Sequence, residues 1–246
     1  MNRKPIFDAV RAILGRGFTQ AEVGAIDRAI DRALEPTDAA PRLGALSARF
    51  ESGTRGPGTV SSGTGDPGGV SYGLYQLSSR AGTVTAFLGG EGALWQGDFA
   101  GLAPGSPAFA AAWQAVAARE PDAFAEAQHA FIERTHYRPV VAAVLRRTGL
   151  DLDSRHVAVR DATWSAAVQH GGAAGVLAEA VERVDTAFAR EDPTYDRALV
   201  EAMYRQRADY VSRVAERSAG SARRLLLSIV AKRYPAEREA ALAMFG

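Results

Sequence analysis

Two carboxylates in a nearly uncharged stretch are the residues of this sequence best suited to chemistry. Glu51 and Asp66 are separated by SGTRGPGTVSSGTG, in which Arg55 is the one charged residue. Cleavage of a glycosidic bond uses one carboxylic acid to protonate the leaving oxygen, and usually a second carboxylate as base or nucleophile. The pair therefore indicates cleavage of a carbohydrate chain.

The surroundings of the two acids favour different roles. Glu51 follows Phe50 at the predicted end of an apolar helix, where burial would raise its pKa and keep its proton for donation. Asp66 lies between Gly65 and Pro67, in polar surroundings that favour the ionised form. Glu51 could instead be a solvated carboxylate at a helix end, and Asp66 a turn aspartate that binds its own backbone.

Aromatic and glycine residues next to Asp66 suit a sugar polymer. Tyr72 and Tyr75 offer flat faces and hydroxyl groups, and glycines such as Gly73 let a backbone approach a sugar closely. Further along the chain, His136 and Trp164 fall on predicted helices. His136 could instead be a structural histidine, and Trp164 could be a core residue.

Composition excludes several other classes of protein. The net charge of +1 does not favour a nucleic-acid partner, and the absence of cysteine removes disulfides and thiolate chemistry. His129 and His136 are two helical turns apart, but a zinc site would need a third ligand, so we expect no metal and no cofactor. No apolar run is long enough for a membrane span, and no signal peptide is recognised. We therefore expect synthesis in the cytoplasm, so that a substrate outside the cytoplasm would require delivery by another route.

The hydrophobic pattern predicts a mainly α protein with one small β patch. Residues 1–36 show two short helical patterns, which we interpret as an N-terminal helical appendage for packing or docking. Residues 41–246 form the predicted catalytic domain, with a small hairpin around 59–62 and 70–72 that lines a cleft. From about residue 108 the chain is predicted to be helical almost to its end, with a bend at Pro139.

A local motif adds a family resemblance. The segments Glu51-Ser52, Gly65-Asp66 and Gly73-Leu74-Tyr75-Gln76 resemble the active-site segment of the goose-type lysozyme and lytic transglycosylase superfamily. With WSAAVQHG downstream, the longer pattern is similar to lysozyme-like wall hydrolases associated with phage tails or type VI secretion. The resemblance implies an α+β lysozyme-like fold, Glu51 as general acid and Asp66 as the residue that positions water. It also implies substrate contacts from Ser52, Tyr72, Gly73, Tyr75, Gln76, Ser78, His136, Trp164, Gln169 and His170.

One departure from that motif leaves the reaction type open. Goose-type enzymes often have a second aspartate where this chain has Ser78, while Asp66 favours hydrolysis over transglycosylation. The expected substrate is the β-1,4 glycan of bacterial peptidoglycan or a related aminosugar polymer. The alternatives are a lytic transglycosylase, a chitosanase-like hydrolase, or a non-catalytic glycan-binding part of a phage tail or secretion apparatus. The expected protein partners are a phage tail, a secretion spike or an immunity protein.

Overall fold

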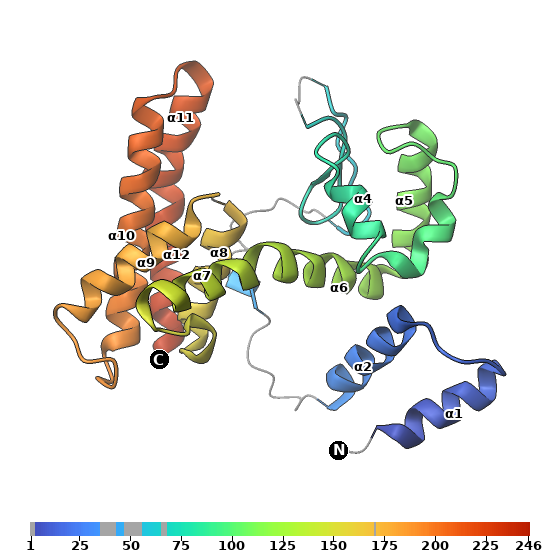
Figure 1. Cartoon of the computed structure of the whole chain (residues 1–246). Helices are drawn as coiled ribbons and strands as arrows, with labels where there is room; N and C mark the ends of the chain where they lie inside the picture. The colour runs from blue at the N-terminus through green and yellow to red at the C-terminus, as the bar shows by residue number, and fades with distance from the viewer. Residues whose placement is uncertain (1–2, 35–42, 47–55, 65–67, 170) are drawn as a thin grey trace. The chain divides into compact units, whose positions relative to one another are not determined.

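The computed structural model describes residues 3–34, 43–46, 56–64, 68–169 and 171–246. The chain divides into two compact units: Met1–Ala39 with Arg55–Phe131, called unit 1 here, and Ala40–Thr54 with Ile132–Gly246, called unit 2. The described residues are mainly helical with one two-stranded sheet, which confirms the predicted class (Figure 1). The division into residues 1–36 and 41–246 stays a prediction.

Unit 1 contains short helices around one small hairpin. Its elements are α1 (Lys4–Leu14), α2 (Gln20–Leu34), β1 (Ser71–Tyr72), β2 (Leu77–Ser78), α4 (Thr83–Leu88), the 3-10 helix η1 (Ala93–Phe99), α5 (Pro107–Arg119) and α6 (Pro121–Ile132), whose last residue belongs to unit 2. A capping box begins α2: the Thr19 amide donates to the Glu22 carboxylate (2.8 Å), and the Glu22 amide donates to the Thr19 hydroxyl (3.3 Å).

Trp113 lies at the centre of an aromatic core in unit 1. Its ring centroid is 5.3 Å from that of Tyr72, 5.6 Å from Phe87 and 4.6 Å from Phe124. Its indole nitrogen donates to the carbonyl of Pro57 at 2.8 Å, so the buried indole finds the polar partner that it needs. The core thereby ties the glycine-rich segment at residues 56–58 to α5.

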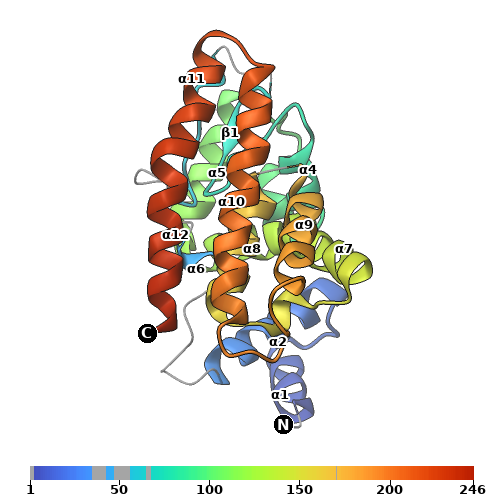
Figure 2. The same ribbon diagram turned by 90° about the vertical axis from the view of Figure 1, so that its left-hand side faces the viewer.

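Unit 2 is a helical bundle built around α8. Its elements are the π-helical turn η2 (Glu133–Tyr137), α7 (Arg138–Thr148), the 3-10 helix η3 (Leu152–Ser154), α8 (Val157–Gln169), α9 (Ala173–Asp185), α10 (Tyr195–Glu216), α11 (Gly220–Ser228), the π-helical turn η4 (Ile229–Arg233), α12 (Tyr234–Leu242) and the 3-10 helix η5 (Ala243–Phe245). Most of α8 is buried, because α10 and α12 pack against it. The long helix α10 also runs beside α9 and α11 (Figures 1 and 2).

Proline explains both π-helical turns. Pro139 and Pro235 each follow such a turn, at the second residue of α7 and of α12. A proline inside a helix lacks the N–H that would bond four residues back, and its ring clashes with that carbonyl, so the chain accommodates it by widening one turn. The structure places a π turn that contains His136 just before Pro139, where a bend was predicted; the bend itself stays a prediction.

A helix that crosses a membrane must be both long and apolar. Among the helices in the described ranges, none combines the length and the apolarity that crossing a bilayer requires.

Candidate functional site

The described parts of the candidate site are the segments that adjoin the two carboxylates. Glu51, Ser52, Asp66 and His170 lie outside the described residues, so their expected roles stay predictions. Unit 1 contains the hairpin that follows Asp66 in the chain. Unit 2 contains the turn that precedes Glu51, together with α8. Each unit is described by itself.

The hairpin in unit 1 joins three short stretches of backbone. Strands β1 and β2 are antiparallel, with Tyr72 opposite Leu77. A third stretch adds to them: the Ser61 amide donates to the Ser71 carbonyl (2.9 Å), and the Gly73 amide donates to the Thr59 carbonyl (2.7 Å). The pairing predicted between 59–62 and 70–72 is therefore present, with β2 as a further strand.

A buried glutamine fixes the loop between the two strands. Gln128 of α6 accepts the Leu74 amide at 2.9 Å and donates to the Pro57 carbonyl at 3.1 Å. Gly73 has a φ of +75°, and a Cβ there would lie 2.1 Å from the Gln128 side-chain oxygen. Gln128 was not recognised from the sequence, although a polar residue at helical spacing between Phe124 and Phe131 was a possible signal.

Gly73→Ala should destabilise the protein by about 2–4 kcal/mol, because it adds a clash with Gln128 to the strain of a positive φ. Gly82→Ala is the matched control, since Gly82 has a φ of +74° and a Cβ there would have no atom within 4 Å. It should cost only the backbone strain, about 1–2 kcal/mol. Urea denaturation of both variants measures the difference, and equal losses would contradict a packed Gly73–Gln128 contact.

The tyrosines expected to bind sugar have internal partners. Tyr72 is fully buried, and its hydroxyl accepts the Gly105 amide at 2.9 Å. The Tyr75 hydroxyl is 2.8 Å from Nδ1 of His129 on α6. Tyr72 therefore packs the hairpin against the rest of unit 1. The side chain of Tyr75 is only partly buried. Glycan contact by either residue stays a prediction.

The polar residues of the loop hold its own backbone. The Gln76 side-chain amide donates to the Gly73 carbonyl at 2.9 Å, and Gln76 itself has a φ of 53°. The Ser78 hydroxyl donates to the Gly68 carbonyl at 2.6 Å and accepts the Ala81 amide at 3.0 Å. Both side chains thus shape the loop, and their predicted contact with substrate remains untested.

In unit 2, Gln169 is held at the end of α8 by two donors. Its side-chain oxygen accepts from the Arg207 guanidinium at 2.8 Å and from the Tyr234 hydroxyl at 2.9 Å. Its side-chain carbonyl is therefore engaged internally. Trp164, also on α8, is 1% exposed and its ring centroid lies 5.8 Å from that of Tyr137. Substrate contact by Gln169 and Trp164 stays a prediction.

Arg207 forms a fully buried ion pair with Glu237. Both side chains are 0% exposed, and their closest charged atoms are 3.6 Å apart. Ser165 of α8 links the two, since its hydroxyl accepts from Arg207 and donates to Glu237, each at 2.9 Å. The guanidinium also lies over the rings of Tyr204 (4.8 Å) and Tyr234 (4.6 Å). Sequence analysis missed this pair because its members lie on different helices.

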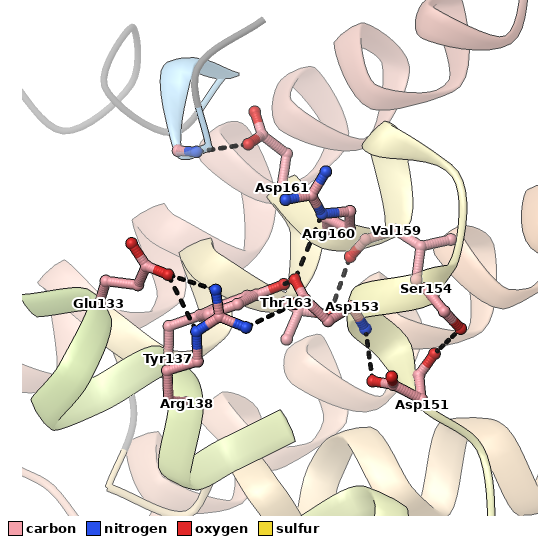
Figure 3. A network of polar contacts seen from close by, with 11 residues as sticks. Glu133, Tyr137, Arg138, Asp151, Asp153, Ser154, Val159, Arg160, Asp161 and Thr163 are labelled. Atoms are coloured by element: carbon pink, nitrogen blue, oxygen red, sulfur yellow. Dashed lines mark hydrogen bonds and ion pairs between the residues drawn. The ribbon is translucent and has the colours of Figure 1, made fainter. Parts of the chain in front are cut away.

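A second polar network surrounds the π turn η2. The Tyr137 hydroxyl donates to Asp153 at 2.7 Å, and Arg138 pairs with both Asp153 and Glu133 (Figure 3). Burial, reinforced by the Asp153 carboxylate, raises the pKa of Tyr137, so its hydroxyl stays protonated and acts as a donor. Arg160 of α8 also pairs with Asp153, at 3.3 Å. The network joins η2 to η3 and α8.

His136 makes stability depend on pH. Its Nδ1 lies 2.8 Å from the Thr135 hydroxyl, and burial lowers its pKa below the ordinary 6.5. Below pH 6.5 His136 is protonated in the unfolded chain but remains neutral in the folded protein. The free energy of unfolding therefore decreases as the pH falls from 6.5 through the lower pKa of the folded state. His136→Gln should therefore lose less stability than the wild type between pH 7 and pH 5 in denaturant titrations. Parallel losses in the two proteins would contradict this assignment.

A metal ion would need several ligand side chains close together. Within the ranges that the structure describes, no three His, Cys, Asp or Glu side chains are grouped to hold a metal ion.

Comparison with known proteins gives two related results. Residues 43–237 match the family described as type VI secretion system spike protein VgrG3-like, C-terminal. The type VI secretion system spike protein VgrG3 of Vibrio cholerae serotype O1 is 42% identical over 139 residues, which are 56% of this chain and 13% of that protein. Both matches point away from the lysozyme-like superfamily that the local motif resembles, so that prediction is wrong.

Proposed function

The chain belongs to the VgrG3-like C-terminal family of type VI secretion spike proteins, and we propose that it cuts the glycan strands of peptidoglycan after delivery by such a spike. Family membership by itself supports a part of a secretion apparatus more strongly than it supports an enzyme. The enzymatic part of the proposal depends on the residues of this chain.

The carboxylate pair carries the proposed reaction. Glu51 would donate a proton to the glycosidic oxygen, and Asp66 would act as a base on water or orient it. In the chain, Asp66 comes shortly before the hairpin held by Gln128, and Glu51 comes five residues after the turn at 43–46. A supported backbone is what a catalytic group needs if it is to keep its position during the reaction.

Hydrolysis of purified peptidoglycan sacculi, chitosan and chitin tests the proposal. We expect the protein to release soluble fragments from sacculi and little from the other two polymers. Release from chitosan alone would favour a chitosanase-like enzyme and contradict the peptidoglycan assignment.

The second candidate is a non-catalytic glycan-binding part of the spike, which the family description favours. It predicts that the protein sediments with sacculi and releases nothing soluble. That result would overturn the enzymatic proposal while leaving the family assignment intact.

A further inference from the structure

The turn between α10 and α11 projects from unit 2. Figures 1 and 2 both show the end of this helical hairpin beyond the ends of α8 and α9. The two helices pack against each other, and Leu226 of α11 packs against the core cluster of the unit. Residues 213–227, called the hairpin tip here, lie within about two helical turns of that turn. The hairpin tip is therefore a projecting surface that a partner can reach.

Positive charge is concentrated at the hairpin tip. It contains four arginines and one acidic residue, a net charge of +3, whereas the whole chain has a net charge of +1. The four side chains are all exposed, and within the part of the chain that the structure describes none of them forms an ion pair: Arg213, Arg217, Arg223 and Arg224. A partner that binds this surface must therefore bring negative charge.

Two leucines are exposed among these arginines. Leu225 is 64% exposed and Leu227 is 43% exposed, while Leu226 between them packs inward. Residues three and four apart on a helix are neighbours, so Leu227 lies beside both Arg223 and Arg224. Covering these two leucines would remove apolar surface from water, which is favourable. A fitting partner therefore offers negative charge and an apolar layer close together.

We propose that the hairpin tip docks the protein on the surface of a lipid bilayer that contains anionic phospholipids. The lipid phosphates accept hydrogen bonds from the guanidinium groups, and the acyl region just beneath them takes up the leucine side chains. Nucleic acid would offer phosphates but no apolar layer for the leucines. This inference goes beyond the proposed function and uses none of the residues assigned to it.

Sedimentation of the full chain with lipid vesicles tests the proposal. We expect at least tenfold stronger partitioning to vesicles of equal parts phosphatidylglycerol and phosphatidylcholine than to vesicles of phosphatidylcholine alone. The difference should shrink when the ionic strength rises from about 0.1 M to about 1 M, because salt shortens the range of the attraction. Equal partitioning to the two kinds of vesicle, or none to either, would overturn the proposal.

Replacing two arginines tests whether the charge of the hairpin tip is responsible. Arg223→Gln with Arg224→Gln should weaken partitioning about 25-fold, since each basic residue near an anionic surface contributes about fivefold. Arg146→Gln with Arg147→Gln is the control, because these are also exposed neighbours on a helix, and Glu182 already pairs with Arg147. The control should stay within threefold of the wild type. Equal losses in the two double variants would show that the hairpin tip is not the docking surface.

Replacing the leucines separates a bilayer from other anionic partners. Leu225→Ser with Leu227→Ser should weaken partitioning at least tenfold, because the apolar contribution is lost. Leu94→Ser with Leu145→Ser is a closely matched control, since these leucines are 63% and 42% exposed. It should stay within twofold of the wild type. Unchanged partitioning in the variant of the hairpin tip would show that no side chain enters the acyl region, and would overturn the proposal.

Duplex DNA is the rival partner that also carries phosphates. We expect the labelled duplex to bind more weakly than anionic vesicles do at the same salt concentration. Tighter binding of the duplex, with the same affinity in Leu225→Ser with Leu227→Ser, would assign the hairpin tip to nucleic acid and overturn the lipid assignment.

A fluorescent label reports which surface meets the lipid, and it does not require a destabilising substitution. The chain has no cysteine, so one introduced cysteine takes an environment-sensitive dye at a single position. Dye on Ala222→Cys, an exposed position of α11, should brighten and shift to the blue on addition of anionic vesicles. Dye on Ala142→Cys, an exposed position of α7, should not change. A response at residue 142 without one at residue 222 would place the docking surface elsewhere and refute the proposal.

Discussion

Replacement of Glu51 by glutamine should lower the rate of glycan cleavage by about 10²–10⁴-fold, the usual contribution of a general acid. Glutamine keeps the size and polarity of the side chain but has no acidic proton to give to the leaving oxygen. The rate of soluble fragment release from sacculi measures the effect, and the melting temperature should stay close to that of the wild type.

Glu120→Gln provides the control for this experiment. Glu120 pairs with Arg119 at the surface, where ion pairs contribute little, so its variant should cleave at the wild-type rate. Full activity in Glu51→Gln would show that Glu51 is not the general acid.

The largest effect on stability is expected from Arg207→Met, at about 3–5 kcal/mol. The substitution leaves the fully buried carboxylate of Glu237 with Arg233 alone as a cation, at 3.4 Å, and it removes a donor from Gln169 and from Ser165. The free energy of unfolding in urea measures this loss.

Two comparisons separate the charge effect from packing. The double variant Arg207→Met with Glu237→Leu removes both charges and should recover much of the stability, because neither partner is left unpaired. Arg147→Met breaks an exposed pair with Glu182 and should cost little. A loss for Arg207→Met as small as that for Arg147→Met would contradict the importance of the buried pair.

Features with a local cause could be predicted from the sequence. The capping box from Thr19 to Glu22 spans four residues, and the glycine at 149 ends α7 in a left-handed conformation. The helix irregularity at Pro139 follows from the missing N–H of proline. In each case one residue type dictates the backbone over a few positions, so the amino-acid pattern was sufficient.

Features that join distant parts of the chain could not be predicted. Asp161 bonds to Gly44 across 117 residues of sequence, and Arg207 meets Glu237 from another helix. Hydrophobic spacing places such residues on a helix but does not say which neighbour they face. Trp164 illustrates this limit, because the sequence does not indicate that its ring packs against the backbone of Gly44.

The family assignment shows a similar limit. The segment Gly73-Leu74-Tyr75-Gln76 is short, and loops of this kind need glycine for conformation in unrelated proteins. The match that corrected the assignment covers residues 43–237 and therefore includes the helices from α4 to α11. A longer pattern distinguishes families that a loop motif alone does not.

Mass analysis of sacculi after incubation with the wild-type protein tests the central claim most directly. The account predicts soluble fragments cut between the sugars of the glycan strand, with new reducing ends from hydrolysis by way of Asp66. Fragments with anhydro sugar ends would still show that the glycan is cut, but by transglycosylation. They would therefore refute the role given to Asp66. Sacculi that keep every glycosidic bond, in the presence of folded protein, would contradict the claim that this chain cuts the cell wall.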